Sequence, residues 1–369
     1  MKKLKICHVS LAVYPDKRDG AAYFCRGLFD TLKKRGHEIT FLTVKWGDGF
    51  DDPDIHTIQV PNSRFLWLVK FITKYRKFLK THDFDIIHGS GSRGSLPIMF
   101  TGKPYISTIY DLGPFEANFT KIPIMKWIER KNAQKASEII TISDISKQGI
   151  VDYMGAQNDK IHNVYCAYDP TFQPQPKRAE KVKKKLGIEG PIIFYVGRIA
   201  FYKGVEDIIK AFYSAKKKIP DLKLVVGGKP TIKMQKVYEQ WKVDYPEVNF
   251  VGMLDGEFLP TYYTMADLFV TYSYASEGFG ITPVEALACG TPVVCSAMPA
   301  YEEILEDHAI FVEPQRPDLL ADAFIDFFKN KELYDEKIPK AQEFIQKYTW
   351  DGVTDRVEEV YQKYLEKSQ

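Results

Sequence analysis

Residues 4–44 read LKICHVSLAVYPDKRDGAAYFCRGLFDTLKKRGHEITFLTV. This segment opens with an apolar run at residues 4–10, continues into a helix-like stretch that ends at Lys34, and closes with an apolar run at residues 37–44. Gly36 stands where a helix commonly ends. The succession predicts a strand, a helix and a second strand, in a βαβ unit of the kind that builds parallel sheets.

The same succession returns in the second half of the chain. An apolar run at residues 191–198 leads into a loop with Lys203 and Gly204, then into a helix-like stretch that ends near Lys218, and then into an apolar run at residues 222–226. Three prolines lie between residues 169 and 176 and mark a linker. We therefore expect two doubly wound α/β domains with a boundary near residue 172.

Further apolar runs mark the other strands that we expect. They lie at residues 86–88, 105–110 and 138–142 in the first half, and at residues 248–251, 268–271, 292–296 and 309–312 in the second. A helix is expected over residues 319–347, followed by a break near Trp350 and a last helix over residues 353–367. This last helix either stays on the second domain or crosses back to the first.

The composition is that of a folded protein with no strong charge bias. The chain has 369 residues, of which 45% are hydrophobic and 27% charged, and its formal net charge is +3. So small a balance argues against a nucleic-acid partner. The five cysteines are scattered without a CxxC pair, and no apolar run approaches the ~20 residues of a membrane span. We expect a cytoplasmic protein in a reducing compartment.

Residues 276–294 read SEGFGITPVEALACGTPVV and predict a turn followed by a helix. Thr282 is expected to be the N-cap, with Pro283 at the first helical position and Glu285 completing a capping box. Gly278 and Gly280 allow a sharp bend before the helix. The N–H groups at such a helix start suit an anionic or hydroxylated ligand, with Glu277 at the rim. A well-capped helix without a ligand is the alternative.

Glu277 and Glu285 have seven residues between them, and this pattern closely resembles the E-x7-E signature of retaining glycosyltransferases of family 4. Other segments are similar to the same family. They are residues 19–43, Asp85–His88, the helix start at Thr141–Asp144, Tyr195–Arg198 with Lys203-Gly204, and the turn at Tyr348–Trp350. The resemblance covers nearly the whole chain.

The resemblance implies the α/β fold named GT-B, with two Rossmann-like doubly wound domains that face a central cleft. Residues 1–172 would form the acceptor-binding domain, residues 173–348 the nucleotide-sugar-binding domain, and residues 349–369 a helix that crosses back to the first. The implied activity is a metal-independent retaining hexosyltransferase, which moves a sugar from a nucleoside-diphosphate sugar to a hydroxyl of a glycan or lipid-linked acceptor. Two alternatives remain, a nucleotide-sugar 2-epimerase and a non-catalytic relative that binds sugar nucleotides.

The resemblance also implies residue roles in donor binding. Arg198 and Lys203 would hold the donor diphosphate, which suits a guanidinium fork and a point charge. Glu277 would accept hydrogen bonds from the transferred sugar, assisted by the N–H groups of Gly278, Phe279 and Gly280, and Glu285 from the ribose. Gly20 matches the second glycine of the family's first loop, whereas Asp19 replaces the first glycine.

Tyr110 and Asp111 depart in part from the family's pattern. Many members have a histidine where this chain has Tyr110, and a tyrosine donates a hydrogen bond but does not relay protons near neutral pH. Tyr110 would replace the donor contact, or the donor or the activity would differ. Asp111 is a candidate for binding acceptor or sugar, or else a turn residue at the end of a strand.

No metal or other cofactor is expected beyond the donor substrate. Asp83-Phe84-Asp85 and Asp52-Pro53-Asp54 match the three-residue DxD motif of the other glycosyltransferase fold. So short a pattern is weak in a chain with 48 acidic residues, and the seven histidines have no metal-ligand spacing.

Residues 64–80 form a basic and aromatic segment. It carries six basic residues, and no acidic residue occurs from Ile55 to His82. Such a helix either contacts anionic lipid at the inner face of a membrane, or packs its apolar side in the core with its lysines in solvent. Peripheral membrane contact through this segment is therefore a hypothesis.

Overall fold

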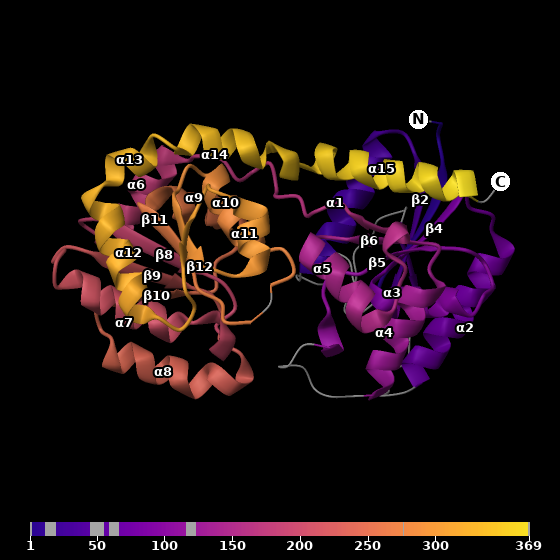
Figure 1. Cartoon of the computed structure of the whole chain (residues 1–369), viewed down its shortest axis with the longest axis horizontal. Helices are drawn as coiled ribbons and strands as arrows, with labels where there is room; N and C mark the ends of the chain where they lie inside the picture. The colour runs from indigo at the N-terminus through magenta and orange to yellow at the C-terminus, as the bar shows by residue number, and fades with distance from the viewer. Residues whose placement is uncertain are drawn as a thin grey trace. The chain divides into compact units, whose positions relative to one another are not determined.

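A seven-stranded parallel sheet forms the centre of the first of two units in this computed structural model (Figure 1). The structure describes residues 2–11, 20–44, 55–58, 66–115, 123–275 and 277–367. The strand order is β3-β2-β1-β4-β5-β6-β7. The strands are β1 (Lys5–Val9), β2 (Glu38–Val44), β3 (Ile55–Ile58), β4 (Ile86–Ser90), β5 (Ile106–Thr108), β6 (Glu138–Thr141) and β7 (Ile161–Asn163). The short edge strands β3 and β7 were not expected from the sequence.

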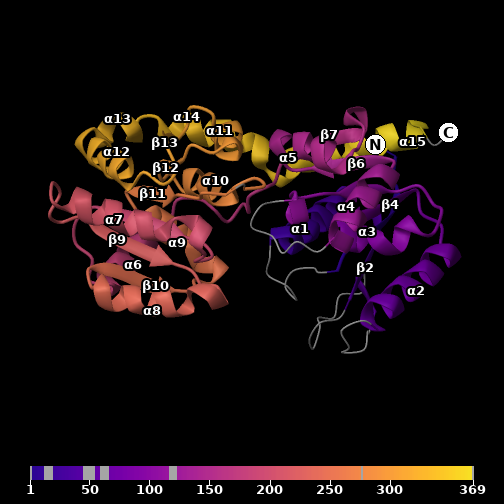
Figure 2. The same cartoon turned by 60° about the horizontal axis from the view of Figure 1, so that its bottom comes forward.

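Helices cover both faces of this sheet. One face carries α1 (Gly20–Lys34) and α15 (Trp350–Lys367), whose apolar side chains share one hydrophobic cluster. The other face carries α2 (Leu66–Thr81), α3 (Gly91–Met99) and α4 (Pro123–Lys135), with α5 (Asp144–Gly149) nearby. Figures 1 and 2 show α15 beside α1 and α2 to α4 on the other side. Ser143 caps α5 by accepting a hydrogen bond from the N–H of Ser146 at 3.1 Å, which confirms the helix start expected there.

The C-terminal helix belongs to the first unit, which decides between the two placements left open by the sequence. Gly27 of α1 packs so closely against the ring of Trp350 that a side chain there would overlap it. Arg35 forms ion pairs with Asp355 at 2.6 Å and with Glu358 at 2.6 Å. Residues 350–369 are therefore part of the unit that contains residues 1–167.

The second unit, residues 168–349, has a six-stranded parallel sheet in the order β10-β9-β8-β11-β12-β13. This unit begins four residues before the expected boundary at residue 172. The N–H of Tyr168 bonds to the carbonyl of Tyr348 at 3.1 Å and Phe172 packs against Tyr263, so the residues from 168 to 172 belong to the second unit. The strands are β8 (Ile192–Val196), β9 (Lys223–Gly227), β10 (Val248–Gly252), β11 (Leu268–Thr271), β12 (Val293–Ser296) and β13 (Ile310–Val312).

Helices also cover both faces of the second sheet. One cluster joins the sheet to α7 (Val205–Lys216), α8 (Gln235–Asp244) and α12 (Pro317–Lys329). The remaining helices are α6 (Pro176–Lys185), α9 (Leu259–Met265), α10 (Ile281–Ala288), α11 (Pro299–Leu305), α13 (Lys331–Asp335) and α14 (Ile338–Phe344). The single helix expected over residues 319–347 was wrong. It is divided into α12, α13 and α14, since the chain breaks at Asn330 and Pro339 opens a new helix.

The basic segment forms α2, and its apolar side is a core face. Phe71, Tyr75 and Leu79 are completely buried, whereas Val69 is exposed. Among the residues that the structure describes, none of the helices combines the length and hydropathy needed to span a bilayer.

Candidate functional site

The expected diphosphate ligands lie at the carboxyl edge of the second sheet. Arg198 and Lys203 follow β8, and Glu277 follows β11, the strand that pairs with β8. Gly204 has φ of +62°, and a side chain there would overlap the carbonyl oxygen of Tyr272. The loop after β8 therefore packs directly on the segment after β11, at the edge where open α/β sheets bind ligands.

Lys203 and Glu277 are joined by an ion pair. The Lys203 Nζ donates to Glu277 Oε1, and the two side chains are only 17% and 16% exposed. The same carboxylate oxygen accepts a hydrogen bond from Ser273 Oγ at 2.6 Å. Two residues that lie 74 positions apart in the sequence are thus brought together at the edge of the sheet.

Arg198 lies beside this pair and is exposed. Its guanidinium donates to the hydroxyl of Tyr202 and lies 5.9 Å from the centre of that ring. The Lys203 ammonium lies 5.5 Å from the same ring centre. Tyr202 therefore places both cations over one aromatic surface, where the ring's negative face favours positive charge.

The turn at Gly278–Gly280 differs from the expected cap. Helix α10 begins at Ile281 with Gly280 as its N-cap, and Gly280 has φ of +80°. A side chain at Gly280 would overlap the ring of Tyr301, so this position requires glycine. The expected N-cap at Thr282 and the capping box with Glu285 were therefore wrong, because the helix starts two residues earlier and Glu285 lies beyond the capping position.

Phe279 and Gly278 contribute backbone to this turn. The ring of Phe279 is buried and packs edge-on against Tyr348, with ring centres 5.3 Å apart. The side chain of Phe279 is thus part of the core of the unit, and only its main chain lies in the turn that opens α10. Ser276 lies outside the described residues.

Glu285 points away from the capping position. It accepts a hydrogen bond from the hydroxyl of Tyr263 at 2.9 Å. Burial raises the pKa of Glu285 to about 7, and the nearby Asp169 also raises it, whereas the Tyr263 hydrogen bond lowers it. This carboxyl group therefore changes charge close to neutral pH.

Gly20 is the first residue of α1 in the first unit. It is exposed, and a side chain there would meet open space. A helix start presents free N–H groups, which is the property expected of the family's glycine loop. Asp19 lies outside the described residues.

Tyr110 points into the first unit. Its hydroxyl lies 2.6 Å from Ser90 Oγ and 3.2 Å from Cys25 Sγ. Burial raises the pKa of Tyr110 well above its usual value, so the hydroxyl stays neutral. The structure therefore places this hydroxyl in a hydrogen-bonded cluster at the carboxyl ends of β4 and β5.

Asp111 follows in the same loop and is exposed. It accepts a hydrogen bond from the N–H of Gly113, as a turn residue does, and this bond lowers its pKa. Desolvation by the surrounding protein has the larger effect and raises the pKa. Glu129 of α4 accepts a hydrogen bond from Ser92, and its pKa is raised to about 7 by burial and also by Asp111. Glu129 lies outside the motifs that predicted the site.

The two DxD matches lie elsewhere. Asp83 and Asp85 precede β4, at the amino edge of the first sheet, and Asp85 Oδ2 accepts a hydrogen bond from the N–H of Lys5 at 2.7 Å. Asp52 and Asp54 lie outside the described residues. In the part of the chain that the structure describes, no three His, Cys, Asp or Glu side chains are grouped as metal ligands.

Two family models match almost the whole chain. The model for glycosyl transferases group 1 matches residues 177–344, and the model for glycosyltransferase family 4 matches residues 18–172. The chain belongs to the group 1, family 4 glycosyltransferases. The structure adds the two Rossmann-like units and the returning C-terminal helix that the resemblance implied.

Curated relatives of this glycosyltransferase are of similar length. It is 26% identical to an uncharacterized glycosyltransferase of Methanocaldococcus jannaschii, over 98% of this chain and 99% of that protein. It is 24% identical to the phosphatidyl-myo-inositol mannosyltransferase of Mycobacterium tuberculosis, over 78% of this chain and 76% of that protein.

Solved structures show the same fold. The structure of Anabaena HepE in complex with UDP and glucose has a TM-score of 0.80 and 18% identity, over 98% of this chain and 100% of HepE. Sucrose-phosphate synthase from Thermosynechococcus elongatus has a TM-score of 0.80 and 20% identity, over 98% of this chain and 99% of that enzyme.

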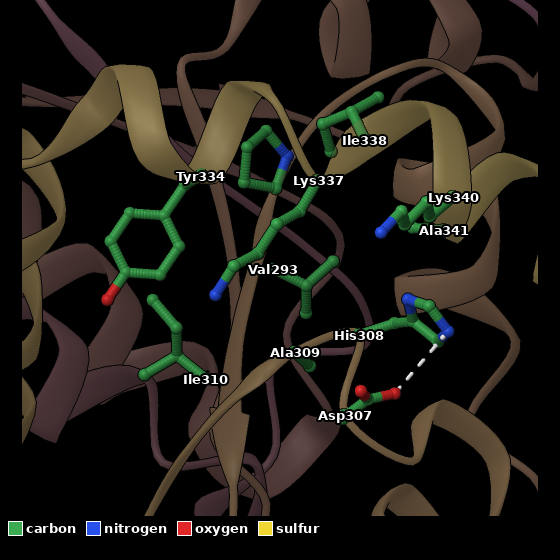
Figure 3. A pocket seen from close by; sticks show the side chains of 11 residues that line it. Val293, Asp307, His308, Ala309, Ile310, Tyr334, Lys337, Ile338, Lys340 and Ala341 are labelled. Atoms are coloured by element: carbon green, nitrogen blue, oxygen red, sulfur yellow. Dashed lines mark ion pairs between the residues drawn. The ribbon is translucent and has the colours of Figure 1, made fainter.

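A separate cavity of about 310 Å³ lies at the amino ends of β12 and β13 (Figure 3). Val293 and Ile310 line it, and Lys337 extends across it while His308 pairs with Asp307 at 3.5 Å. Because the strands are parallel, this cavity opens at the edge of the sheet opposite to Lys203 and Glu277. We assign it no part in the chemistry of this glycosyltransferase.

Sequence reasoning missed the residues that support the expected ligands. Ser273 bonds to Glu277, Tyr263 bonds to Glu285, and Tyr202 supports both cations. Ser273 had a usable signal, since it lies two residues beyond the carboxyl end of β11, where ligand-binding residues gather. Tyr263 had none, because it comes from a helix of the core.

Proposed function

We propose that this glycosyltransferase moves a hexose from a nucleoside-diphosphate sugar to an acceptor hydroxyl, with retention of anomeric configuration. The observation that carries the proposal is the grouping of Arg198, Lys203 and Glu277 at the carboxyl edge of the second sheet. Two cations suit a diphosphate, and an adjacent carboxylate suits the hydroxyls of the sugar attached to it. A donor with both features fits this set of side chains.

The chemistry requires that charge be stabilised on the leaving group. In the transfer, the bond between the anomeric carbon and the diphosphate oxygen breaks, and the acceptor oxygen bonds to that carbon on the same face. The acceptor proton passes to the leaving diphosphate. Arg198 and Lys203 would stabilise the diphosphate as its negative charge grows, and no covalent nucleophile is needed.

The rest of the donor would extend along the start of α10. The N–H groups of Gly278, Phe279 and Gly280 would assist Glu277 in binding the sugar, and Glu285 would accept hydrogen bonds from the ribose. Helix starts favour such contacts. The UDP and glucose bound to Anabaena HepE are in keeping with a donor of this class. In the first unit, Gly20, Tyr110 and Asp111 remain proposed contributors to donor or acceptor binding.

We propose a glycan or lipid-linked acceptor, at the cytoplasmic face of a membrane. The name of the mycobacterial relatives, phosphatidyl-myo-inositol mannosyltransferase, supports an acceptor of this kind. The basic side of α2 is the proposed contact with anionic lipid, since its apolar residues Phe71, Tyr75 and Leu79 are buried in the core. The interaction would therefore be electrostatic and would weaken as salt is added.

A thermal-shift panel with UDP, GDP, ADP, dTDP and CMP, each with EDTA or with Mg²⁺, tests the donor. A ligand at a hundred times its Kd adds about 2.7 kcal/mol to the free energy of unfolding. We expect one diphosphate to raise the melting temperature in EDTA. A shift that needs Mg²⁺ would contradict metal independence, and no shift with any nucleotide would contradict the proposed function.

Product analysis with the selected donor separates transfer from the alternatives. Transfer needs an acceptor and releases the nucleoside diphosphate with the anomer retained. An epimerase converts the donor without acceptor, and a non-catalytic relative binds the donor without transfer or slow hydrolysis.

Liposome flotation with and without anionic lipid tests the membrane contact. We expect recovery only with anionic lipid, and expect that replacing Lys70, Lys74 and Lys77 by glutamine abolishes it. Equal recovery from both vesicle types would contradict an electrostatic contact. The matched control replaces Lys181, Lys183 and Lys184 of α6 in the second unit, a helix that carries a comparable run of lysines.

A further inference from the structure

The Lys203–Glu277 ion pair sets a competition within the proposed donor site. Under the proposed function, on which this inference rests, Lys203 binds the diphosphate and Glu277 binds the sugar. In the structure each side chain binds the other instead. Both are mostly buried, so water screens their attraction less than at an open surface. The ammonium therefore exchanges one anionic partner for another when a diphosphate arrives.

The two partners are held to different degrees. Ser273 is completely buried and donates to Glu277 Oε1 at 2.6 Å. Behind it, the hydroxyl of Tyr301 lies 3.5 Å from Ser273 Oγ and 3.1 Å from Thr271 Oγ1. The carboxylate is thus fixed from the side of the sheet, whereas the lysine ammonium ends a flexible four-carbon stem. The ammonium is therefore the less constrained of the two partners.

We propose that Glu277 is an internal counter-ion for Lys203 that the donor diphosphate displaces, and that Ser273 is the positioning residue that keeps Glu277 in place during the exchange. With the complete donor, the freed carboxylate gains hydrogen bonds from the sugar hydroxyls. With the product diphosphate, which has no sugar, it faces a second anion with nothing to bind. The pair therefore weakens binding of the product relative to the donor.

Titration calorimetry of Glu277→Gln with the nucleoside diphosphate selected above, and with inorganic pyrophosphate, tests the exchange. We expect both ligands to bind about tenfold more tightly than to the wild type, because the competing charge is gone. The donor should gain less, because the amide accepts the sugar hydroxyls less well. The control is Glu302→Gln, which removes one exposed charge from α11 in the same unit and should leave both affinities unchanged.

Ser273→Ala provides a second arm, in case Glu277→Gln does not fold. We expect the ratio of product Kd to donor Kd to fall about threefold, since the carboxylate loses its orienting hydrogen bond, and Ser273→Thr to restore it. Weaker or equal binding of the diphosphate by Glu277→Gln would overturn the inference, because Glu277 would then prepare Lys203 for the ligand. If neither wild type nor variant binds any diphosphate, the proposed function fails instead.

Discussion

Among the residues that the structure describes, the side chains that meet at the carboxyl edges of the two sheets differ in charge, although the two units are built alike. In the second unit, the loops after β8 and β11 bring Arg198, Lys203 and Glu277 together. In the first unit, Ser90 at the end of β4 and Tyr110 after β5 are connected by hydrogen bonds to each other and to Cys25 of α1, and all three side chains are uncharged. The parallel sheet fixes where loops gather, and the loop residues decide which ligand charge is favoured.

Under the proposed function, this contrast favours the second unit for the anionic part of the donor. An uncharged cluster of hydroxyl and thiol groups would contribute little to the binding of a diphosphate, whereas the two cations over the ring of Tyr202 would contribute strongly. Among the described residues, burial raises the pKa of one carboxyl group in each unit to about 7, Glu285 in the second unit and Glu129 in the first. Glu285 lies on α10, the helix that follows Glu277 and the turn at Gly278–Gly280.

The largest effect is expected from the cations. Lys203→Ala or Arg198→Ala should lower turnover by a factor of about 10²–10³, because one pre-organised donor to the leaving group is lost. Steady-state transfer with the selected donor measures this. Lys210→Ala is the matched control, since Lys210 pairs only at the surface with Glu206. If both Lys203→Ala and Arg198→Ala kept near wild-type turnover, the charged edge of the second unit would have no special role in the reaction.

A smaller effect is expected from Ser273→Ala. Loss of the hydrogen bond to Glu277 should lower kcat about tenfold, the cost of a hydrogen bond to a charged group. A purely structural role would lower the melting temperature and leave kcat intact, so both are measured. Ser273→Thr, which keeps the hydroxyl, should recover most of the activity.

The two raised carboxyl groups sharpen the comparison through pH. Below about pH 7, Glu285 gains a proton and loses its capacity to bind ribose as an anion. We expect diphosphate affinity to fall about threefold from pH 8 to pH 6 relative to Glu285→Gln, whose own titration is absent. Calorimetry at both pH values measures this. In Glu129→Gln, the diphosphate affinity should change with pH as it does in the wild type. If Glu129→Gln lost this pH dependence, the contrast between the two units would be wrong.

The raised pKa values of Glu285 and Glu129 also make the free energy of unfolding depend on pH. The pKa of Glu285 is raised from 4.5, so the folded chain retains a proton that the unfolded chain releases. The free energy of unfolding should therefore fall as pH rises from about 4.5 to about 7. Denaturant melts should show this fall reduced in both Glu285→Gln and Glu129→Gln, although only the former alters nucleotide binding.

The smallest effect on activity is expected from Tyr110→Phe. The substitution keeps the ring and removes the hydroxyl that bonds to Ser90, which should lower the free energy of unfolding by about 1 kcal/mol. The donor KM should change less than about twofold. A tenfold rise in donor KM at unchanged stability would show that this hydroxyl contacts the donor, which would decide between the donor and acceptor roles proposed for Tyr110.

Much of the architecture could be predicted because it rests on local patterns. The apolar runs of β1, β2, β8 and β9 and the glycines after them are readable one segment at a time. The edge strands β3 and β7 are short and consist of polar as well as apolar residues, so they contain no apolar run that would mark them. The residues from 319 to 347 have helical spacing throughout, so the breaks at Asn330 and Pro339 were not predicted.

The sequence by itself determined the family, the two α/β units and the chemical types of the expected ligands. Tertiary structure decided the start of α10 at Ile281, the inward direction of Tyr110 and the placement of α15 on the first unit. It also decided the pairing of Lys203 with Glu277 and the support from Ser273. These contacts join residues that lie far apart in the sequence, and local patterns along a chain carry no information on which distant side chains meet in the fold.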